Sequence, residues 1–593
     1  MRNIKSFDLL IRNGLIYDGD GGEPYIGDIG IDHGQISAIG TLEEMSATRE
    51  IDATGLIITP GFIDLHTHYD GQVSWDTDLQ PSVNHGVSTV VMGSCGVGFA
   101  PVKSEDQDRL INLMEGVEDI PGTALHEGLT WNWESFPEYM EAIDFPHAID
   151  FAAQVVHDPL RVYVMGERAS YDEQATPEEI AEMRRLTREA LEAGAVGFST
   201  GRSDVHRSSD GEWTPSSEAN VTELTGIAQA LAHLDHGVLQ AVNDFDLERK
   251  DPDAFDREFD LLESFVAAGG GRPFSLSLMQ RDLAPNQWRQ IMERAELARK
   301  EKNLPIYLQV APRGIGVTLG LQCTFHPFMG YPSYKKISHL SLAERVERMK
   351  DPTFKHQLLS EKSERVAGDG TSIPPIADLL LAQIEQLAFK MFLLGDIPDY
   401  EQPMTQSLGA QAKAKGLGPL EMIYDTLLQD DGRALIYFPI YNYTNMNYDA
   451  VHTMMTHPQA LLGLTDGGAH VGTICDSSFP TYLLCYWSRD RKKDRIPLSR
   501  AVQMLSADPA DYMGFDDRGR LQVGKRANIN IIDFENLHLC APQMVQDLPA
   551  GGQRLLQSAR GFKAVLVGGE VVLKNDQLTG SLPGKLLRGG VSR

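Results

Sequence analysis

The N-terminal part of the chain alternates short apolar runs with polar turn residues, a pattern typical of β-strands joined by tight turns. Asn13-Gly14 separates two of these runs and predicts a β-hairpin. The C-terminal part has the same character, so we expect the two ends of the chain to form one sheet system. The apolar runs are residues 9–11, 15–17, 28–31, 35–39, 528–533 and 564–572.

Between these ends, strand-like and helix-like segments alternate, as a parallel β/α fold requires. Three strand-like runs end near His66, Cys95 and Asp466, and five more bring the number of strands to eight. Eight strands separated by helices predict an α/β protein of the (β/α)8 TIM-type barrel class. The five further runs are residues 151–156, 195–200, 237–242, 274–278 and 306–310.

The clearest helix is predicted over residues 177–193, where apolar positions recur on one face. Thr176 and Glu179 have the spacing of a capping box, and Pro177 suits the first turn of a helix. Gly194 supplies the stop.

Residues 322–460 are too many for one loop of a compact domain, and their patterns predict an inserted helical subdomain before the last barrel strand. Ser341 and Glu344 offer a further capping box there. Such an insert lies at the barrel mouth, where it could cover a substrate. A purely structural flap is equally compatible with the sequence.

The composition of the chain argues against some macromolecular partners but says little about small substrates. The 593 residues carry a formal charge of −30, which argues against nucleic acid and against anionic membrane surfaces. A local patch could still attract an anionic substrate. The five cysteines form no CxxC pair, no signal peptide is recognisable, and no run approaches the roughly 18 apolar residues of a spanning helix. We expect a soluble, cytoplasmic protein, and its oligomeric state is left open.

His66 and His68 follow an apolar run, two residues apart. In a strand, such residues point to the same face, so both imidazoles can approach one metal ion. Neutral imidazoles suit zinc, which generates hydroxide from water near neutral pH. Alone, the pattern is also that of two surface histidines on an edge strand.

Two further landmarks follow in order. A Gly93-Ser94-Cys95-Gly96 turn follows the apolar run 87–92. Asp466 lies in the segment 462–470, which begins with apolar residues and continues into a pair of glycines. With the His-x-His motif, they make the chain resemble the amidohydrolase superfamily, and within it the N-acyl-D-amino-acid deacylase (D-aminoacylase) family. The resemblance implies a β-sandwich from residues 1–59 and 515–593 around a catalytic barrel at 60–514.

The resemblance also implies a zinc site in which His66, His68, Cys95 and Asp466 converge, with Asp466 as general base and acid. From the residues alone, Cys95 is also a small buried hydrophobe, and Asp466 also a turn residue. The flanking glycines favour the metal role for Cys95, because they let the turn approach an ion closely.

The chain departs from the family at strands five and six, where members carry one histidine each. Residues 239–244 and 277–282 contain no imidazole, and glutamine is a weak zinc ligand. One ion is therefore expected rather than two, and the alternatives are an exchangeable divalent metal or none. The histidines that could compensate are His157, His206, His326 and His470.

Polar residues near the strand ends are candidates for substrate binding. Arg313 could pair with a substrate carboxylate, or form an ordinary salt bridge. The predicted function is hydrolysis of a C–N bond in N-acyl amino acids or related small amides. The alternatives are hydrolysis of cyclic amides or esters, a lyase reaction, and a non-catalytic ligand-binding barrel. The other substrate-binding candidates are Gln240, Gln280, Gln309 and His470.

Overall fold

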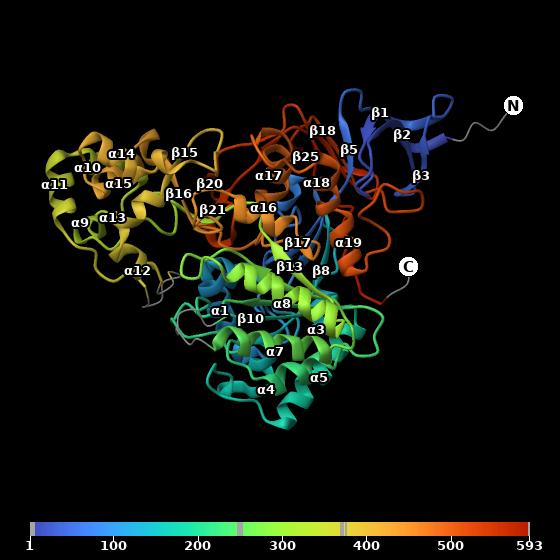
Figure 1. Ribbon diagram of the computed structural model, residues 1–593, viewed down its shortest axis with the longest axis horizontal. Helices are drawn as coiled ribbons and strands as arrows, with labels where there is room; N and C mark the ends of the chain where they lie inside the picture. The colour runs from blue at the N-terminus through green and yellow to red at the C-terminus, as the bar shows by residue number, and fades with distance from the viewer. Residues whose placement is uncertain (1–5, 246–252, 368–372, 374–375, 591–593) are drawn as a thin grey trace.

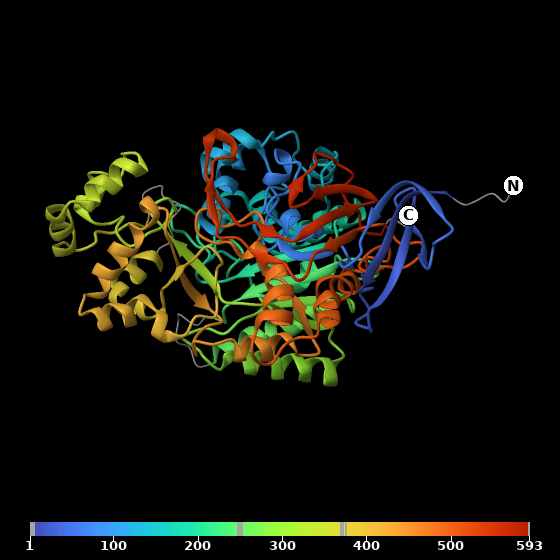
Figure 2. The same ribbon diagram turned by 90° about the horizontal axis from the view of Figure 1, so that it is seen from above.

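The computed structural model describes residues 6–245, 253–367, 373 and 376–590 of an α/β protein. The N-terminal strands, drawn in blue, lie at one end of the molecule, and a helical lobe, drawn in yellow, projects from the other (Figures 1 and 2). The parallel strands lie between them. Among the described helices, none combines the length and the apolar character needed to cross a membrane.

Strands from both ends of the chain share a nine-stranded sheet in the order β25-β24-β23-β18-β5-β1-β2-β3, with β4 paired to β1. Its inward side chains form a separate apolar cluster that includes Leu9, Ile29, Ile531 and Leu566. The strands are β1 (Ser6–Ile16), β2 (Tyr25–Asp32), β3 (Gln35–Gly40), β4 (Ser46–Asp52), β5 (Ile57–Pro60), β18 (Ile529–Ile532), β23 (Phe562–Val567), β24 (Glu570–Lys574) and β25 (Gln577–Leu578).

The hairpin predicted at Asn13-Gly14 was wrong. β1 runs through both residues and pairs with β2 on either side of them, with a register shift between Ile11 and Gly14. Asn13 adopts a left-handed conformation (φ 59°), which asparagine tolerates, and its N–H donates to Asp28 Oδ1 at 2.9 Å. A left-handed residue can close a two-residue turn, but here it produces a β-bulge. The reason is that the apolar runs on both sides of Asn13 pair with the same strand, β2.

The central parallel strands form two sheets in chain order, β6-β7-β8 and β9-β10-β11-β12-β13-β17. Gln154 separates β8 from β9, and an isolated parallel bridge joins Thr67 at the end of β6 to Gly467. Most of their side chains are buried on both faces, as expected of parallel strands covered by helices. The strands are β6 (Phe62–Thr67), β7 (Val87–Met92), β8 (Asp150–Ala153), β9 (Val155–Val156), β10 (Gly197–Arg202), β11 (Val238–Asn243), β12 (Phe274–Leu278), β13 (Ile306–Val310) and β17 (Ala460–Leu462).

Helices in the connections cover these strands, and Figure 1 shows α5, α7 and α8 lying across one side of the body. The capping box predicted for α5 is confirmed: Thr176 and Glu179 bond reciprocally, and the helix ends before Gly194 (φ 114°). The helices are α1 (Gln107–Glu118), α2 (Gly122–Gly128), α3 (Phe136–Ala142), α4 (His157–Met165), α5 (Pro177–Glu192), α6 (Val221–Ala228), α7 (Ala254–Ala268), α8 (Gln287–Lys302), α17 (Phe479–Tyr482), α18 (Leu498–Leu505) and α19 (Ala507–Met513).

The helical lobe lies between β13 and β17 and has its own apolar cluster, which includes Phe328, Leu358 and Ile423. At its base a small antiparallel sheet has the order β14-β16-β15. The capping box of Ser341 and Glu344 is confirmed at the start of α10. Its elements are β14 (Ile315–Leu319), α9 (Pro332–Lys335), α10 (Leu342–Lys350), α11 (Pro352–Ser360), α12 (Ile376–Ala382), α13 (Ile384–Leu387), β15 (Phe392–Leu394), α14 (Leu408–Lys415), α15 (Pro419–Leu427) and β16 (Leu435–Tyr441). The next helix, α16 (Asp449–Met455), packs in the body against β13 and β17.

Candidate metal centre

Three side chains from β6 and from the turn after β7 form a buried cluster. His66, His68 and Cys95 each place one potential ligand atom within 4.8 Å of the other two. His66 Nε2 lies 3.3 Å from Cys95 Sγ. His66 lies in β6 and His68 directly follows its last residue, Thr67, and both imidazoles reach the same cluster, as the i, i+2 spacing predicts.

Asp466 completes the cluster from the loop after β17. Its Oδ1 lies 3.2 Å from His66 Nε2 and 3.7 Å from His68 Nε2. The sequence suggested that the last strand reaches Asp466, but β17 ends at Leu462. Asp466 therefore belongs to a loop, with a left-handed backbone (φ 50°).

Hydrogen bonds fasten this loop to β6. The N–H of Asp466 donates to the carbonyl of His66 at 3.2 Å, and the N–H of His68 donates to the carbonyl of Gly467 at 2.7 Å. Thr465 Oγ1 donates to the buried carboxylate of Asp64 at 2.6 Å. The position of Asp466 is thus set by the strand that carries the two histidines.

The turn that carries Cys95 needs its glycines. Cys95 (φ 57°) and Gly96 (φ 79°) both have left-handed backbones, and a Cβ on Gly96 would lie 2.7 Å from the backbone nitrogen of Gly201 in β10. The N–H of Gly96 donates to Ser199 Oγ at 3.1 Å. Close approach of this turn to β10 holds the thiol beside His66.

The donor set fits a divalent ion such as zinc. Two imidazoles, one sulfur and one carboxylate are the ligand types that zinc prefers. Within the described part of the chain, neither ring nitrogen of the buried His68 has a hydrogen-bond partner. Unpartnered buried polar atoms are costly, and coordination of a cation would satisfy one of them.

The protonation states favour cation binding. Burial lowers the pKa values of His66 and His68, which keeps both imidazoles neutral near pH 7. Burial alone would raise the pKa of Asp466, but the contact with His68 and the influence of His66 and His470 outweigh it and lower the pKa. Burial raises the pKa of the Cys95 thiol, so a cation is needed to make it a thiolate.

Two of the three glutamines named as substrate-binding candidates contact His66 of the centre. Gln309 Oε1 lies 2.8 Å from His66 Nδ1, and Gln240 Nε2 lies 3.5 Å from the same atom. Gln280 points elsewhere, because its Oε1 accepts from the N–H of Thr444 at 3.3 Å. Gln240 and Gln309 therefore belong to the surroundings of the centre, whereas Gln280 lies at the base of the helical lobe.

Glu118, at the end of α1, is a member of this neighbourhood that sequence reasoning missed. Its Oε1 lies 3.3 Å from His68 Nδ1, and its Oε2 lies 3.4 Å from His470 Nε2. It lies outside every motif, in a helix whose pattern is otherwise ordinary, so no sequence signal separates it from a surface glutamate. The carboxylate is nevertheless buried, with a side chain 2% exposed.

The partly exposed members of the centre show from which side it can be reached. The side chains of Asp466 and His470 are 16% and 25% exposed, whereas that of His68 is fully buried. His206 is also partly exposed, and burial together with the influence of His470 and His68 lowers its pKa to about 3. Asp466, His470 and His206 therefore form the side of the centre that is open to solvent.

The other predicted candidates lie in different surroundings. Both ring nitrogens of His157 are used, by Thr200 Oγ1 at 2.8 Å and Glu223 Oε1 at 2.9 Å. His326 Nδ1 accepts from a backbone N–H in the helical lobe. Arg313 is buried, with its guanidinium 3.0 Å from Asp476 Oδ1 and 3.9 Å from the Tyr400 ring centroid. These contacts favour a structural role for Arg313.

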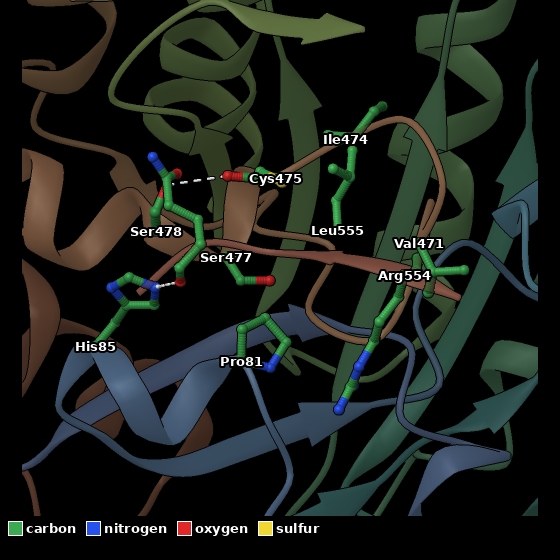
Figure 3. Close-up of a pocket in the computed structure, with 12 residues that line it drawn as sticks. Pro81, His85, Val471, Ile474, Cys475, Ser477, Ser478, Arg554 and Leu555 are labelled. Atoms are coloured by element: carbon green, nitrogen blue, oxygen red, sulfur yellow. Dashed lines mark hydrogen bonds between the residues drawn. The ribbon is translucent and has the colours of Figure 1, made fainter. Parts of the chain in front are cut away.

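A small cavity of about 20 Å³, room for about one water molecule, adjoins the loop after Asp466 (Figure 3). His85 points toward it and bonds to the carbonyl of Gln557 at 2.8 Å, and Ser478 Oγ donates to the carbonyl of Cys475 at 2.9 Å. None of the four candidate ligands lines this cavity, so it is distinct from the metal centre.

Comparison with known proteins identifies the family of the chain. A model of the amidohydrolase family matches residues 49–573, so the chain belongs to the amidohydrolase family. The D-aminoacylase of Alcaligenes xylosoxydans xylosoxydans is 26% identical over 582 residues, covering 98% of this chain and 97% of that protein. An uncharacterized protein of Mycobacterium tuberculosis is 28% identical over 610 residues, covering 97% of this chain and 93% of its own.

The fold is shared with a solved structure, the N-acyl-D-glutamate deacylase of Bordetella bronchiseptica in complex with zinc and a phosphonate inhibitor. The two structures superpose with a TM-score of 0.62 at 24% identity, over 98% of this chain and 100% of the other. The resemblance inferred from the three motifs is thereby confirmed at the level of family and fold.

Proposed function

We propose that this protein is a metal-dependent hydrolase of C–N bonds that removes the acyl group from N-acylated amino acids or related small amides. The observation that carries the proposal is the meeting of His66, His68, Cys95 and Asp466 from distant parts of the chain. Family membership supports amide hydrolysis, and the curated relatives named as D-aminoacylase and N-acyl-D-glutamate deacylase support the substrate class.

We propose that His66, His68, Cys95 and Asp466 hold one zinc or similar divalent ion. When bound, the ion polarises the substrate carbonyl and lowers the pKa of water. A D-aminoacylase of this fold is described as having a binuclear centre in which one metal activates and the second attenuates. The absence of imidazoles from β11 and β12 favours a single ion here.

Asp466 is the group proposed to move protons. Its carboxylate is ionised and partly exposed on the reachable side of the centre. Asp466 Oδ1 accepts a proton from the attacking water as the new C–O bond forms at the acyl carbon. The same oxygen then gives that proton to the departing amine nitrogen as the C–N bond breaks. The products are an amine and a carboxylic acid, which passes its remaining proton to the amine or to solvent, and the aspartate returns to its starting state.

We propose the parallel strands β6 to β13 and β17 as a (β/α)8 barrel that delivers these side chains to one point. The bridge between Thr67 and Gly467 and the continuity of the chain through Gln154 support closure of the two sheets. The domain boundaries expected from the sequence belong to the same proposal. Figure 1 shows the helical lobe standing to the side of the body.

A panel of substrates tests the function. Zinc-loaded protein is incubated with N-acetyl and longer N-acyl derivatives of D- and L-amino acids, and the released amine is measured. The proposal expects hydrolysis of at least one series and its loss in Asp466→Asn. A zinc-loaded, folded protein that cleaves none of these, but cleaves a cyclic amide or an ester, would replace the proposed substrate class. A protein that binds ligands without cleaving any of them would exclude the enzyme.

A further inference from the structure

Glu118 is a buried carboxylate that contacts two histidines of the metal centre. It is the last residue of α1, in the connection that follows β7, and its side chain is 2% exposed. Its salt contacts, over the residues that the structure describes, are with His68 and His470 and with no lysine or arginine. A buried carboxylate without a strong cationic partner costs free energy, so its retention here needs an explanation.

The backbone fixes this carboxylate next to the metal centre. The N–H of His470 donates to the carbonyl of Glu118, which joins the end of α1 to the loop after Asp466. The next residue, Asp119, ends the helix in a left-handed conformation (φ 51°), and its Oδ2 accepts from Thr473 Oγ1 at 2.9 Å. Hydrogen bonds accepted by Glu118 and Asp119 thus join the end of α1 to the loop after Asp466. The Glu118 side chain lies between the imidazoles of His68 and His470.

The imidazole of His68 lies between the carboxylates of Glu118 and Asp466. Its Nδ1 lies 3.3 Å from Glu118 Oε1, and its Nε2 lies 3.7 Å from Asp466 Oδ1. Neither His68 Nδ1 nor Glu118 Oε1 has a hydrogen-bond partner among the residues described, so each is available to the other. A carboxylate that accepts from Nδ1–H fixes the tautomer, leaves the Nε2 lone pair for a cation and makes the imidazole a stronger donor.

We propose that Glu118 is the positioning carboxylate of the metal centre. It orients His68 through Nδ1 and holds His470 at the partly exposed side of the site. The proposal rests on the metal-dependent function argued above. It also gives a physical reason why a centre without imidazoles on β11 and β12 can retain an ion: a carboxylate behind one of the remaining histidines strengthens that ligand.

The test measures zinc affinity and needs no substrate. Metal-free wild-type protein, Glu118→Gln and Glu118→Ala are titrated with zinc against a chromogenic chelator. Loss of the carboxylate is expected to weaken zinc binding about 10–100-fold, with Ala at the larger end because Gln keeps an acceptor oxygen. Cobalt titrations of the same proteins should show a changed visible spectrum in both variants, because the His68 donor is altered.

Glu115→Gln is the matched control. It removes a carboxylate from the same helix, and glutamine can still accept from the N–H of Gly122, which Glu115 Oε1 does at 2.8 Å. Zinc affinity and cobalt spectrum should equal those of the wild type. The melting temperature of each metal-free variant is measured by circular dichroism to separate misfolding from weaker binding.

Two results would overturn the proposal. One is wild-type zinc affinity and an unchanged cobalt spectrum in both Glu118 variants. The other is a lowered melting temperature with unchanged affinity, which would make Glu118 purely structural. Failure of the proposed function is recognised separately: wild-type protein that binds zinc but cleaves no N-acyl amino acid leaves the role of Glu118 intact, whereas wild-type protein that binds no zinc removes both.

Discussion

Gln309 accepts a hydrogen bond from His66, with Oε1 2.8 Å from the imidazole Nδ1. The amide is held in this orientation because its Nε2 donates to Ser275 Oγ at 2.9 Å. An amide oxygen can only accept, so Nδ1 carries the ring proton. His66 Nε2 is then unprotonated where it faces Cys95 and Asp466. A neutral residue on β13 thus sets the tautomer that metal binding requires.

Replacing Gln309 by leucine should weaken zinc binding about tenfold or more, because the tautomer and ring orientation of His66 are no longer fixed. Gln309→Glu keeps an acceptor for Nδ1–H and should lose less. Zinc affinity is measured by chelator competition. Gln280→Leu is the control, since Gln280 bonds to Thr444 and not to His66. Equal affinities of the wild type and Gln309→Leu would show that this bond does not matter.

Asp466→Asn should lower the rate of amide hydrolysis about 10²–10⁴-fold, because asparagine cannot take a proton from water. Zinc should remain bound through His66, His68 and Cys95, with reduced affinity. The measurement pairs single-substrate kinetics with metal analysis of the same sample. The exposed Asp516→Asn serves as the control and should leave both unchanged. Near wild-type turnover in the Asp466→Asn enzyme would assign the proton transfers to another group.

Asp158, in the first turn of α4, should make stability depend on pH. Burial raises the pKa of Asp158 to about 7. The hydrogen bonds from Ser216 lower the pKa, but by less than burial raises it. Between about pH 4 and pH 7 the folded state keeps this proton and the unfolded chain releases it. The stability contributed by the neutral form is therefore present below pH 4 and is lost as the pH rises through 7.

Asp158→Asn cannot titrate, so the stability of the wild type relative to this variant should fall by up to about 4 kcal/mol between pH 4 and pH 8. Urea unfolding of both proteins at several pH values measures the difference. Asp108→Asn, at an 85% exposed side chain, should track the wild type throughout. A constant difference between wild type and Asp158→Asn would contradict the raised pKa.

A buried ion-pair cluster joins the C-terminal segment to β8. Asp150 Oδ2 lies 2.7 Å from Arg518 Nη1 and 2.9 Å from Arg526 Nε, with Asp150 and Arg518 almost fully buried. Asp150→Ala would remove the buried carboxylate that Arg518 and Arg526 share, leaving Arg518 with the partly exposed Asp517 at 2.8 Å, and should cost about 3 kcal/mol of stability. Glu570→Ala, which breaks the exposed pair with Arg49, should cost no more than about 1 kcal/mol. Denaturant unfolding compares the two; similar small losses would contradict the account.

Local signals proved readable where both partners lie close in sequence. The capping boxes at Thr176 and Ser341 follow from spacing alone, because both hydrogen bonds close within one helical turn. The face shared by His66 and His68 follows from strand periodicity in the same way. Asn13-Gly14 shows the limit: the dipeptide fixes a left-handed residue, but the pairing of β2 with both flanks decides between a turn and a bulge.

Long-range relationships were readable only through family resemblance, or not at all. Cys95 and Asp466 were placed by motif, and the loop that carries Asp466 is set by bonds to β6 that no local pattern encodes. Glu118 was missed because its role depends on where α1 ends in space. For Arg313 the sequence left open a substrate carboxylate or a salt bridge. In the structure it pairs with the buried Asp476, which lies 163 residues away in the sequence and could not be identified as its partner beforehand.

The most direct test of the central claim is a zinc titration of metal-free protein with hydrolysis of an N-acyl amino acid followed in the same cuvette. The account predicts that activity rises linearly and saturates near one equivalent of zinc, and that His68→Ala, folded as judged by its circular dichroism, neither binds zinc tightly nor gains activity. Full hydrolytic activity in the metal-free protein, or saturable zinc binding that His68→Ala leaves unchanged, would contradict it.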